Sequence, residues 1–239
     1  MAFDQPVVQG TLVRRYKRFL ADVQLQEPDK ETVVTAHVAN TGSMLGLCDV
    51  GNKVLMSYVP SPKRRLAYSL QAIQVKGVWV GCNTQLPNRL VQQIAEKGNF
   101  AGFCGYESIR REVPYAQNNR SRIDLLLSKH HQGKPDLFVE VKNVTLRQGD
   151  VACFPDAVTQ RGQKHLRDLM EVVQQGHRAA SVFVVQRTDC THFAPACNID
   201  PDYAAGLRLA QQAGVSVWCF VAQVTSKGIQ LQGQLPVHV

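Results

Sequence analysis

The sequence predicts two domains of different class: a small β-barrel of the OB kind over residues 1–84, and an α/β domain with a mixed central sheet over residues 85–239. Short segments rich in β-branched and alternating apolar residues, separated by turn signals, occupy the first part of the chain. From residue 85 onward, helical patterns alternate with apolar strands. A chain of 239 residues is long enough to bury a core in each domain.

The N-terminal part is predicted to contain short strands separated by turns rich in Gly, Pro, Asn and Asp. The expected strands cover residues 11–25, 32–39, 52–59, 66–76 and 78–82. That number of strands in about 80 residues is typical of an OB-type barrel, which commonly binds single strands or other polymers on one face.

The C-terminal part is predicted to alternate between helices and strands. Gly98, Gly176 and Gly214 follow the helical patterns and are suited to end them. The expected helices are 87–97, 156–175 and 202–213, and the expected strands are 121–127, 136–142, 181–186 and 215–222. The last two strands are uninterrupted apolar runs, as expected in a sheet covered on both faces.

The overall charge and the cysteines restrict the class of protein. A formal charge of +8 favours polyanionic partners such as nucleic acid. Seven scattered cysteines without a C-x-x-C motif indicate reduced thiols in a cytoplasmic compartment. No apolar stretch has the length of a transmembrane helix and the N-terminus does not resemble a signal peptide, so we expect no membrane partner.

Asp124 and the triplet Glu140-Val141-Lys142 form the segment most suggestive of chemistry. Side chains alternate along a strand, so Glu140 and Lys142 point the same way and Val141 faces the core. A hairpin of the two expected strands would bring Asp124 beside Glu140. The competing interpretation is a surface cross-strand pair with Asp124 capping a turn, which is common for an isolated E-x-K triplet.

The apolar surroundings of both acids favour a site over that alternative, because ionised carboxylates are disfavoured in such strands unless they are paired or bound to a metal. Two carboxylates, with the Val141 carbonyl, are suited to hold Mg²⁺ or Mn²⁺. Lys142 could then orient or help to deprotonate an attacking water and offset the charge of a phosphorane. The sequence therefore outlines a phosphodiesterase site.

A set of stretches in order along the chain carries a family resemblance: residues 15–23, 40–44, 121–124, 139–146, 154–166 and 199–200. Together they resemble the sugar fermentation stimulation protein A (SfsA) family. The resemblance implies an OB-like barrel followed by a restriction-endonuclease-like domain, similar to the PD-(D/E)xK nucleases. It also implies a protein that binds DNA largely without sequence preference, with a name linked to regulation of sugar, notably maltose, metabolism.

In the PD-(D/E)xK motif, Asp124 matches the first acid and Glu140-x-Lys142 matches the (D/E)xK part. Ile123 stands where the motif name has proline, a position that commonly varies. The Pro155-Asp156 pair is not the motif, because we expect it to open a helix after the site strands. A further acid often comes from a preceding helix. Glu107 and Glu112 are both available for that role.

Basic side chains gather in three places that suit phosphate contacts, which position a protein without reading sequence. Arg161, Lys164 and His165 lie on the expected helix 156–175, and His165 could also assist the water; a solvated helix face is the alternative. Tyr16 and Phe19 interleave with the first barrel cluster and could stack on bases or belong to the core. The barrel candidates are Arg14, Arg15, Lys17, Arg18, Lys63, Arg64 and Arg65.

The polar segment 40–44 has two equally good interpretations: a close backbone approach to phosphate at Gly42, or an ordinary Asx-type turn. For the whole chain the sequence predicts a cytoplasmic DNA-binding protein, with RNA as the other possible partner, carrying a Mg²⁺-dependent nuclease site. The alternatives are a non-catalytic DNA-binding regulator of sugar metabolism that retains a nuclease-like fold, and a carbohydrate-binding role for the barrel.

Overall fold

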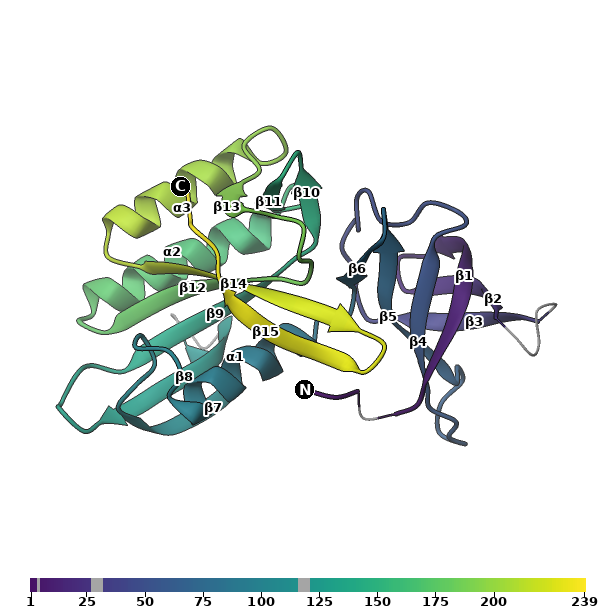
Figure 1. Ribbon diagram of the computed structural model, residues 1–239. Helices are drawn as coiled ribbons and strands as arrows, with labels where there is room; N and C mark the ends of the chain where they lie inside the picture. The colour runs from purple at the N-terminus through teal and green to yellow at the C-terminus, as the bar shows by residue number, and fades with distance from the viewer. Residues whose placement is uncertain (4, 27–31, 116–120) are drawn as a thin grey trace.

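The computed structural model describes residues 1–3, 5–26, 32–115 and 121–239, and these form two domains built on separate sheets (Figure 1). The N-terminal domain is a β-barrel, and the C-terminal domain is a mixed sheet covered by helices. The barrel strands are β1 (Val7–Tyr16), β2 (Leu20–Leu25), β3 (Val33–Val38), β4 (Lys53–Tyr58), β5 (Tyr68–Val75) and β6 (Val78–Gly81).

The barrel closes through a parallel pairing between β3 and β5. Strand β1 pairs antiparallel with β2 and β4, β4 pairs with β5, and the β3–β5 contact closes β1 to β5 into a ring, with β6 added beside β5. Alternate side chains such as Leu12, Val23 and Leu70 fill the interior and are almost completely buried. The predicted OB-type barrel is confirmed.

One predicted barrel element is wrong in detail: residues 11–25 form two strands rather than one. Lys17 and Arg18 have φ angles of 50° and 65°, in the left-handed region that a continuous strand does not use. The chain therefore reverses at residues 17–19, and β1 and β2 form a hairpin. The basic residues of this segment consequently divide between a strand and a tight turn, instead of alternating along one strand.

The C-terminal sheet has the order β15-β14-β12-β9-β8-β7. Strand β12 runs parallel to β9 and β14, whereas the other pairings are antiparallel, so the predicted mixed sheet is confirmed. Its strands are β7 (Tyr106–Tyr115), β8 (Ser121–His130), β9 (Leu137–Val144), β12 (Arg178–Val185), β14 (Ser216–Thr225) and β15 (Gly228–Gln234). A smaller sheet comprises β10 (Leu146–Gln148), β11 (Val151–Phe154) and β13 (His192–Pro195).

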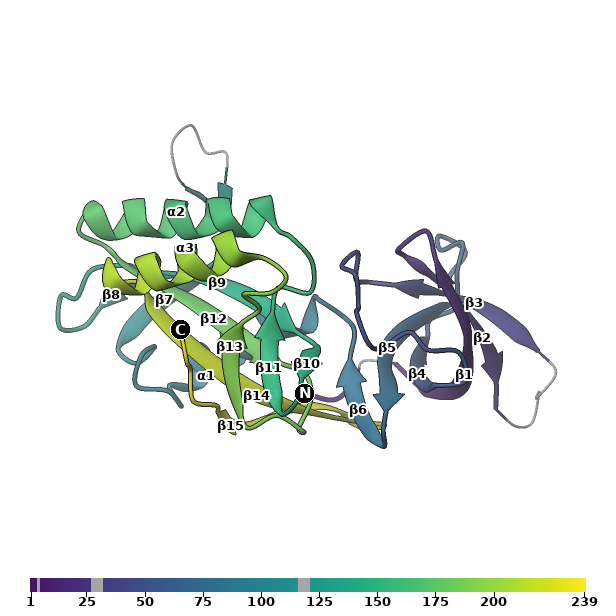
Figure 2. The same cartoon turned by 90° about the horizontal axis from the view of Figure 1, so that it is seen from above.

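Helices cover both faces of the C-terminal sheet: α1 (Leu86–Lys97) lies on one face, and α2 (Gln160–Gln174) and α3 (Pro201–Gln212) pack together on the other (Figure 2). The prediction that Asp156 opens α2 is wrong. The helix begins at Gln160, because Thr159 is the N-cap and its Oγ1 accepts a hydrogen bond from the Gly162 amide at 3.0 Å.

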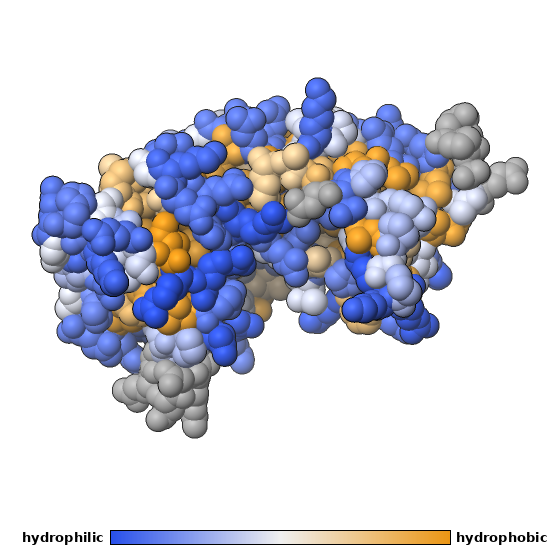
Figure 3. Space-filling view, turned by 90° about the horizontal axis from the view of Figure 1, so that it is seen from below, coloured by the Kyte–Doolittle hydropathy of each residue, from blue (hydrophilic) through white to orange (hydrophobic). Residues whose placement is uncertain are grey.

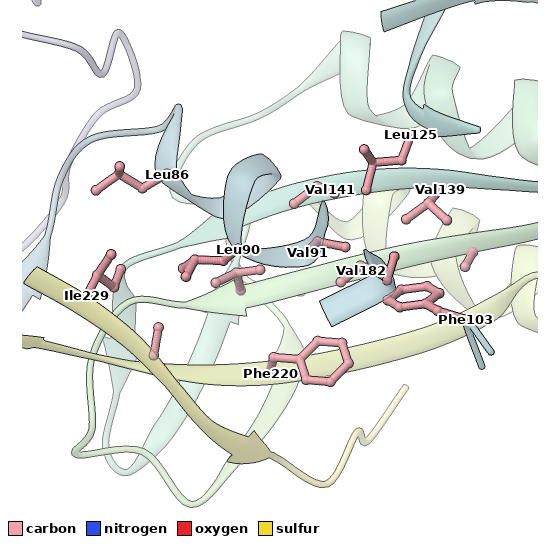
Figure 4. Packing of buried hydrophobic residues seen from close by; sticks show 14 of the residues in the cluster. Leu86, Leu90, Val91, Phe103, Leu125, Val139, Val141, Val182, Phe220 and Ile229 are labelled. Carbon is pink, nitrogen blue, oxygen red and sulfur yellow. The ribbon is translucent and has the colours of Figure 1, made fainter. Parts of the chain in front are cut away.

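Helix α1 supports the strands that carry the two predicted acids. Its apolar face, with Leu86, Leu90 and Val91, packs against side chains of β8, β9, β12 and β14 (Figure 4). Val141 belongs to this cluster and is 8% exposed, as its place between Glu140 and Lys142 predicts. Burial of these apolar surfaces fixes β9 against α1 and thereby fixes the two charged residues that flank Val141.

The two domains are joined by backbone contacts near β6. The Gly81 amide donates to the Gln186 carbonyl at 2.9 Å, and Gln186 Nε2 donates to the Asn83 carbonyl at 3.3 Å. A Cβ at Gly81 would lie 2.3 Å from the Gln186 side chain, so this close approach requires glycine. No helix among the described residues has the length and apolar character that crossing a membrane requires.

Candidate active site

Asp124 and Glu140 lie together at the point where β8 and β9 separate. The two strands pair from Leu127↔Leu137 to Leu125↔Val139, and the ladder stops there. At the next residue, Asp124, a side-chain contact replaces the backbone pairing between the strands. Its Oδ2 accepts a hydrogen bond from the Val141 amide at 2.7 Å. The structure thus brings together the two acids that the hairpin prediction pairs.

The surroundings of Asp124 disfavour the ionised form of its carboxyl group. Its Oδ1 accepts a hydrogen bond from Asn88 Nδ2 of α1 at 2.7 Å. Burial, with the negative charge of Glu140 as the second cause, raises the pKa of Asp124 to about 7, although the Val141 amide and the Lys142 charge oppose this. Near neutral pH this carboxyl group therefore gains or loses a proton readily.

Glu140 is ionised although it is only 4% exposed. Its Oε1 accepts a hydrogen bond from Lys142 Nζ at 2.7 Å and contacts His165 Nδ1 of α2. Burial would raise the pKa of Glu140, but the Lys142 charge and the His165 contact outweigh it and lower that pKa to about 2. The two neighbouring acids therefore differ in protonation, because only Glu140 is bonded directly to the Lys142 ammonium, whereas Asp124 accepts from the neutral Val141 amide and Asn88 side chain.

A short chain of contacts fixes the Glu140 carboxylate from the side of α2. Arg161 Nε donates to His165 Nε2 at 3.3 Å, which assigns the imidazole proton to Nδ1, facing Glu140. The start of α2 is in turn tied to α3, because the Asp200 carboxylate accepts from the Thr159 amide at 2.8 Å. Asp200 also caps α3 through the Tyr203 amide at 2.9 Å.

The two acids, together with Lys142, Arg161 and His165, line a cleft of about 320 Å³ between the C-terminal sheet and the barrel. Figure 3 shows one face of the molecule with a hollow between the two domains, bordered largely by hydrophilic side chains. The cleft is lined by Asn40, Gly42, Thr84, Asn88, Asp124, Glu140, Val141, Lys142, Asn143, Thr145, Leu146, Cys153, Phe154, Asp156, Arg161 and His165.

One buried oxygen of the cleft, Oε2 of Glu140, has no hydrogen-bond partner among the residues that the structure describes. Such an atom is costly unless a cation or donor approaches it. Within the described residues no three His, Cys, Asp or Glu side chains form a metal-binding group. A cation here would consequently depend on Asp124, Glu140 and backbone oxygen, a donor set that suits Mg²⁺ or Mn²⁺ rather than Zn²⁺.

A second hollow of about 470 Å³ adjoins the cleft and shares four of its residues, Asp124, Glu140, Arg161 and His165. Glu112 lines this second hollow, together with Ser121, Arg122 and Lys164, whereas Glu107 lines neither. The expectation that an additional acid comes from a helix is wrong, because both glutamates lie on strand β7. Of the two, Glu112 is the one beside the site acids.

The basic residues of the β1–β2 hairpin have different partners. Arg14 pairs with Asp22 at 2.7 Å and lies over the Tyr16 ring. Arg15 donates through Nη2 to the carbonyls of Arg18, Asn40 and Gly42, and through Nη1 to that of Ser43, which makes it a brace for the segment 40–44 (the 40–44 loop). Lys17 and Arg18 are exposed at the turn, and Phe19 is 45% exposed beside them.

The remaining predicted basic residues also differ in availability. Lys63, Arg64 and Arg65 are exposed in the loop before β5, where Arg64 Nη2 donates to Ser69 Oγ at 2.8 Å. Lys164 is engaged by the buried carboxylate of Asp168 at 2.7 Å, so its charge is largely neutralised. Arg161 is exposed and lines both hollows.

Sequence reasoning missed two contributors to the cleft and left the role of a third open. Asn88 of α1 contacts Asp124, and Asp156 accepts a hydrogen bond from the Met44 amide at 2.9 Å. The 40–44 loop, for which two interpretations stood open, forms a wall of the cleft. The polar composition of the 40–44 loop signals a turn, and the structure contains one, since Asn40 Oδ1 accepts from the Gly42 amide. Its position beside the acids depends on domain packing, which no local pattern reveals.

Comparison with known proteins supports this division of the chain. The family model described as "Sugar fermentation stimulation protein RE domain" matches residues 85–228, and the model "SfsA N-terminal OB domain" matches residues 13–82. The chain belongs to the sugar fermentation stimulation protein family. Relatives named as homologues of that protein include those of Geobacter sulfurreducens (53% identity, 99% of this chain and 98% of the relative) and Rhodospirillum centenum (50%, 98% and 98%).

A solved member of the family has the same architecture. The structure of Pyrococcus furiosus SfsA in complex with Ca²⁺ matches with a TM-score of 0.88 and 28% sequence identity, covering 100% of this chain and 98% of that one. Both domains therefore have the fold and the relative arrangement seen in this family. The predicted resemblance to the SfsA family is confirmed.

Proposed function

We propose that this SfsA-family chain is a nuclease that depends on a divalent cation, Mg²⁺ or Mn²⁺, and that its cleft is the active site. The observation that carries the proposal is the pair of carboxylates, Asp124 and Glu140, with Lys142 bonded to Glu140. The Glu140 Oε2 atom has no partner within the described part of the chain. An acid pair of this kind, next to a lysine, is the residue set of the PD-(D/E)xK nucleases, and we assign the C-terminal domain to that type.

The donor set fits a hard cation. Asp124, Glu140 and the Val141 carbonyl would hold it, and the Ca²⁺ complex of the Pyrococcus furiosus relative supports cation binding within the family. A bound Mg²⁺ supplies Lewis-acid polarisation of a phosphoryl oxygen and makes water a better nucleophile. Its charge would also offset the burial and the repulsion by Glu140 that together hold the pKa of Asp124 high.

The protein groups around the cation site have separate tasks. The Lys142 ammonium orients the attacking water and offsets the negative charge that develops on the phosphorane. His165, through Nδ1, keeps the Glu140 carboxylate in place, and Arg161 keeps the imidazole in the required tautomer. Since Arg161 is exposed in the cleft, its guanidinium also contacts a phosphate of the substrate.

The charge of the chain supports the proposal that it binds DNA. A net charge of +8, with exposed Lys17, Arg18 and residues 63–65 on the barrel, favours a polyanion. Phosphate contacts carry no sequence information, so we propose binding that is largely independent of sequence. All seven cysteines, each within the described residues, are free thiols, which suits the cytoplasm, where thiols stay reduced.

The test is cleavage of labelled DNA and RNA by the purified protein with Mg²⁺, with Mn²⁺ or with EDTA. We expect cleavage that requires the cation and that falls by at least about 100-fold in Glu140→Gln and Lys142→Ala, because both remove charge from the reaction centre. The matched controls are Glu107→Gln and Lys134→Ala, which alter exposed residues outside the cleft.

Retained DNA binding without cleavage of any substrate would refute the nuclease and leave a DNA-binding regulatory protein. Cleavage unaffected by Glu140→Gln would place the chemistry elsewhere. Retention of DNA binding in both site variants is expected, because the exposed barrel cations remain in place.

A further inference from the structure

The site acids lie where two hollows meet. The cleft extends from them toward the barrel, as far as Asn40 and Thr84, and the second hollow extends past Arg122 and Lys164. Because both hollows share Asp124, Glu140, Arg161 and His165, the acids occupy the middle of a longer groove rather than the end of a closed pocket. This shape suits a linear polymer that passes over the acids.

The barrel and the C-terminal domain touch across this groove. Ser43 Oγ donates to the Asp156 carbonyl at 2.8 Å, and the Met44 amide donates to Asp156 Oδ2 at 2.9 Å. A Cβ added to Gly42 would lie 3.4 Å from the same carboxylate. Arg15 fixes the other side of the 40–44 loop through the Gly42 carbonyl at 2.8 Å and the Asn40 carbonyl at 3.0 Å. The walls are therefore held close together.

Part of the site also lies deep below the rim. Glu140 is 4% and His165 is 7% exposed, whereas Asp124 is half-buried. The cleft volume of about 320 Å³ is at the lower end of the range for small-molecule pockets, roughly 300–1,000 Å³. A duplex is a broad and stiff rod, and its phosphates could not descend between walls that are bonded to each other. A single strand is narrower and flexible, and can present one phosphodiester unit at a time.

The exposed side chains near the rim of the cleft also favour a single strand over a duplex. Phe19 is 45% exposed, and its carbonyl accepts from the Val38 amide, two residues before Asn40 in the cleft wall. Leu45, which follows the 40–44 loop, is 52% exposed. Lys17 and Arg18 are exposed beside Phe19. Apolar and aromatic side chains among cations suit unpaired bases, whose faces can stack, whereas the bases of a duplex are already stacked on each other.

We propose that the groove takes a single strand of nucleic acid and excludes an intact duplex, an inference that rests on the phosphodiesterase function proposed above. The 40–44 loop and Asp156 set the width, and Phe19 and Leu45 receive bases outside the cleft. Asp156 and Arg15 are positioning residues here. The bond broken is the backbone P–O bond of an unpaired segment, with water as the nucleophile.

The test compares one sequence in several forms: a labelled single strand of DNA, the same strand as RNA, the blunt DNA duplex, and a duplex with a single-stranded tail. We expect kcat/KM for single strands and tails to exceed that for the blunt duplex by at least about 10-fold, with cuts confined to unpaired segments. Equal cleavage of the blunt duplex would overturn the proposal. The DNA and RNA arms identify which kind of strand is used.

A binding arm without divalent cation separates this proposal from the nuclease. Anisotropy at fixed salt should show single strands bound at least about 10-fold more tightly than the duplex. If that preference is found and no form is cleaved, nor a small chromogenic phosphodiester, the nuclease fails and strand selection stands. If the duplex binds as tightly as the single strand, strand selection is refuted whatever the outcome of the cleavage assay.

Two variants probe the structural basis. Phe19→Ala should weaken single-strand binding by about 5- to 100-fold, as expected for loss of one stacking side chain. The control Leu209→Ala, which alters another exposed apolar residue, on α3, should have no effect. Asp156→Ala should reduce the ratio of single-strand to duplex cleavage, because the Met44 amide loses its acceptor. Asp156→Asn, which keeps an oxygen acceptor, should restore the ratio. An unchanged ratio in Asp156→Ala would show that the contact does not set the width.

Discussion

Lowering the pH from 7 to 5 should weaken the binding of Mg²⁺ or Mn²⁺ to the cleft by about 50-fold. A carboxylate must be deprotonated to bind a cation, and the pKa of Asp124 is raised to about 7 by burial and by Glu140. About half of the cation-free molecules therefore carry an ionised Asp124 at pH 7, and about one in a hundred at pH 5. Glu140 adds nothing to this dependence, since its pKa of about 2 keeps it ionised throughout.

Isothermal titration calorimetry in two buffers of different ionisation enthalpy would measure both the affinity and the number of protons released. We expect the affinity to rise about ninefold from pH 5 to 6 and about fivefold from pH 6 to 7, and to level off above 7, with release of about one proton per cation at pH 6. Asp124→Asn is the control, in which any residual binding should release no proton. A cation affinity that is constant between pH 5 and 7 would show that ionisation of Asp124 does not control cation binding.

Three further predictions concern stability and support of the site. In EDTA at pH 8, Asp124→Asn should raise the free energy of unfolding by roughly 2–4 kcal/mol, because the pKa of Asp124 is about 7 in the fold against 3.8 in the unfolded chain. Urea titrations should show this gain vanish as the pH falls toward 4, and Asp49→Asn, at the surface, should show none. His165→Ala should lower cation affinity by about 10-fold in calorimetry, since Glu140 loses a contact; unchanged affinity would contradict the role of His165. Asp200→Ala removes the acceptor for the Thr159 and Tyr203 amides and should lower the melting temperature by about 4–10 °C in scanning calorimetry, against no change for exposed Asp202→Asn.

The acid pair could be predicted from sequence because its determinants are local. Strand alternation places Glu140 and Lys142 on one side and Val141 on the other, and one hairpin brings in Asp124. The surrounding apolar residues mark both acids as exceptions that need a partner. The barrel was predictable for the same reason, since short alternating segments with clear turns specify neighbouring strands.

The missed elements depend on weaker or non-local signals. Strand β7 lies at a sheet edge with charged, exposed residues, and β15 is largely exposed, so neither shows a clean apolar pattern. The β1–β2 turn is formed by Lys17 and Arg18 in a conformation that these residues rarely adopt, so no Gly or Asn marks it.

The contact that forms the wall of the cleft could not be predicted from local sequence patterns. Met44 and Asp156 are 112 residues apart in sequence, and their contact arises only when the two domains pack together. Asp156 resembles a helix start by composition, yet Thr159 takes the cap, which leaves the aspartate available for the barrel.

Because Asp156 contacts the 40–44 loop, neither domain can be replaced by that of another protein without affecting this contact. A chimera that receives a foreign barrel would keep all its acids yet lose a side of the groove, unless the loop and its acceptor were transplanted as one unit. For the same reason, replacing the 40–44 loop with a longer one would change which substrates fit the groove while leaving the site acids unaltered.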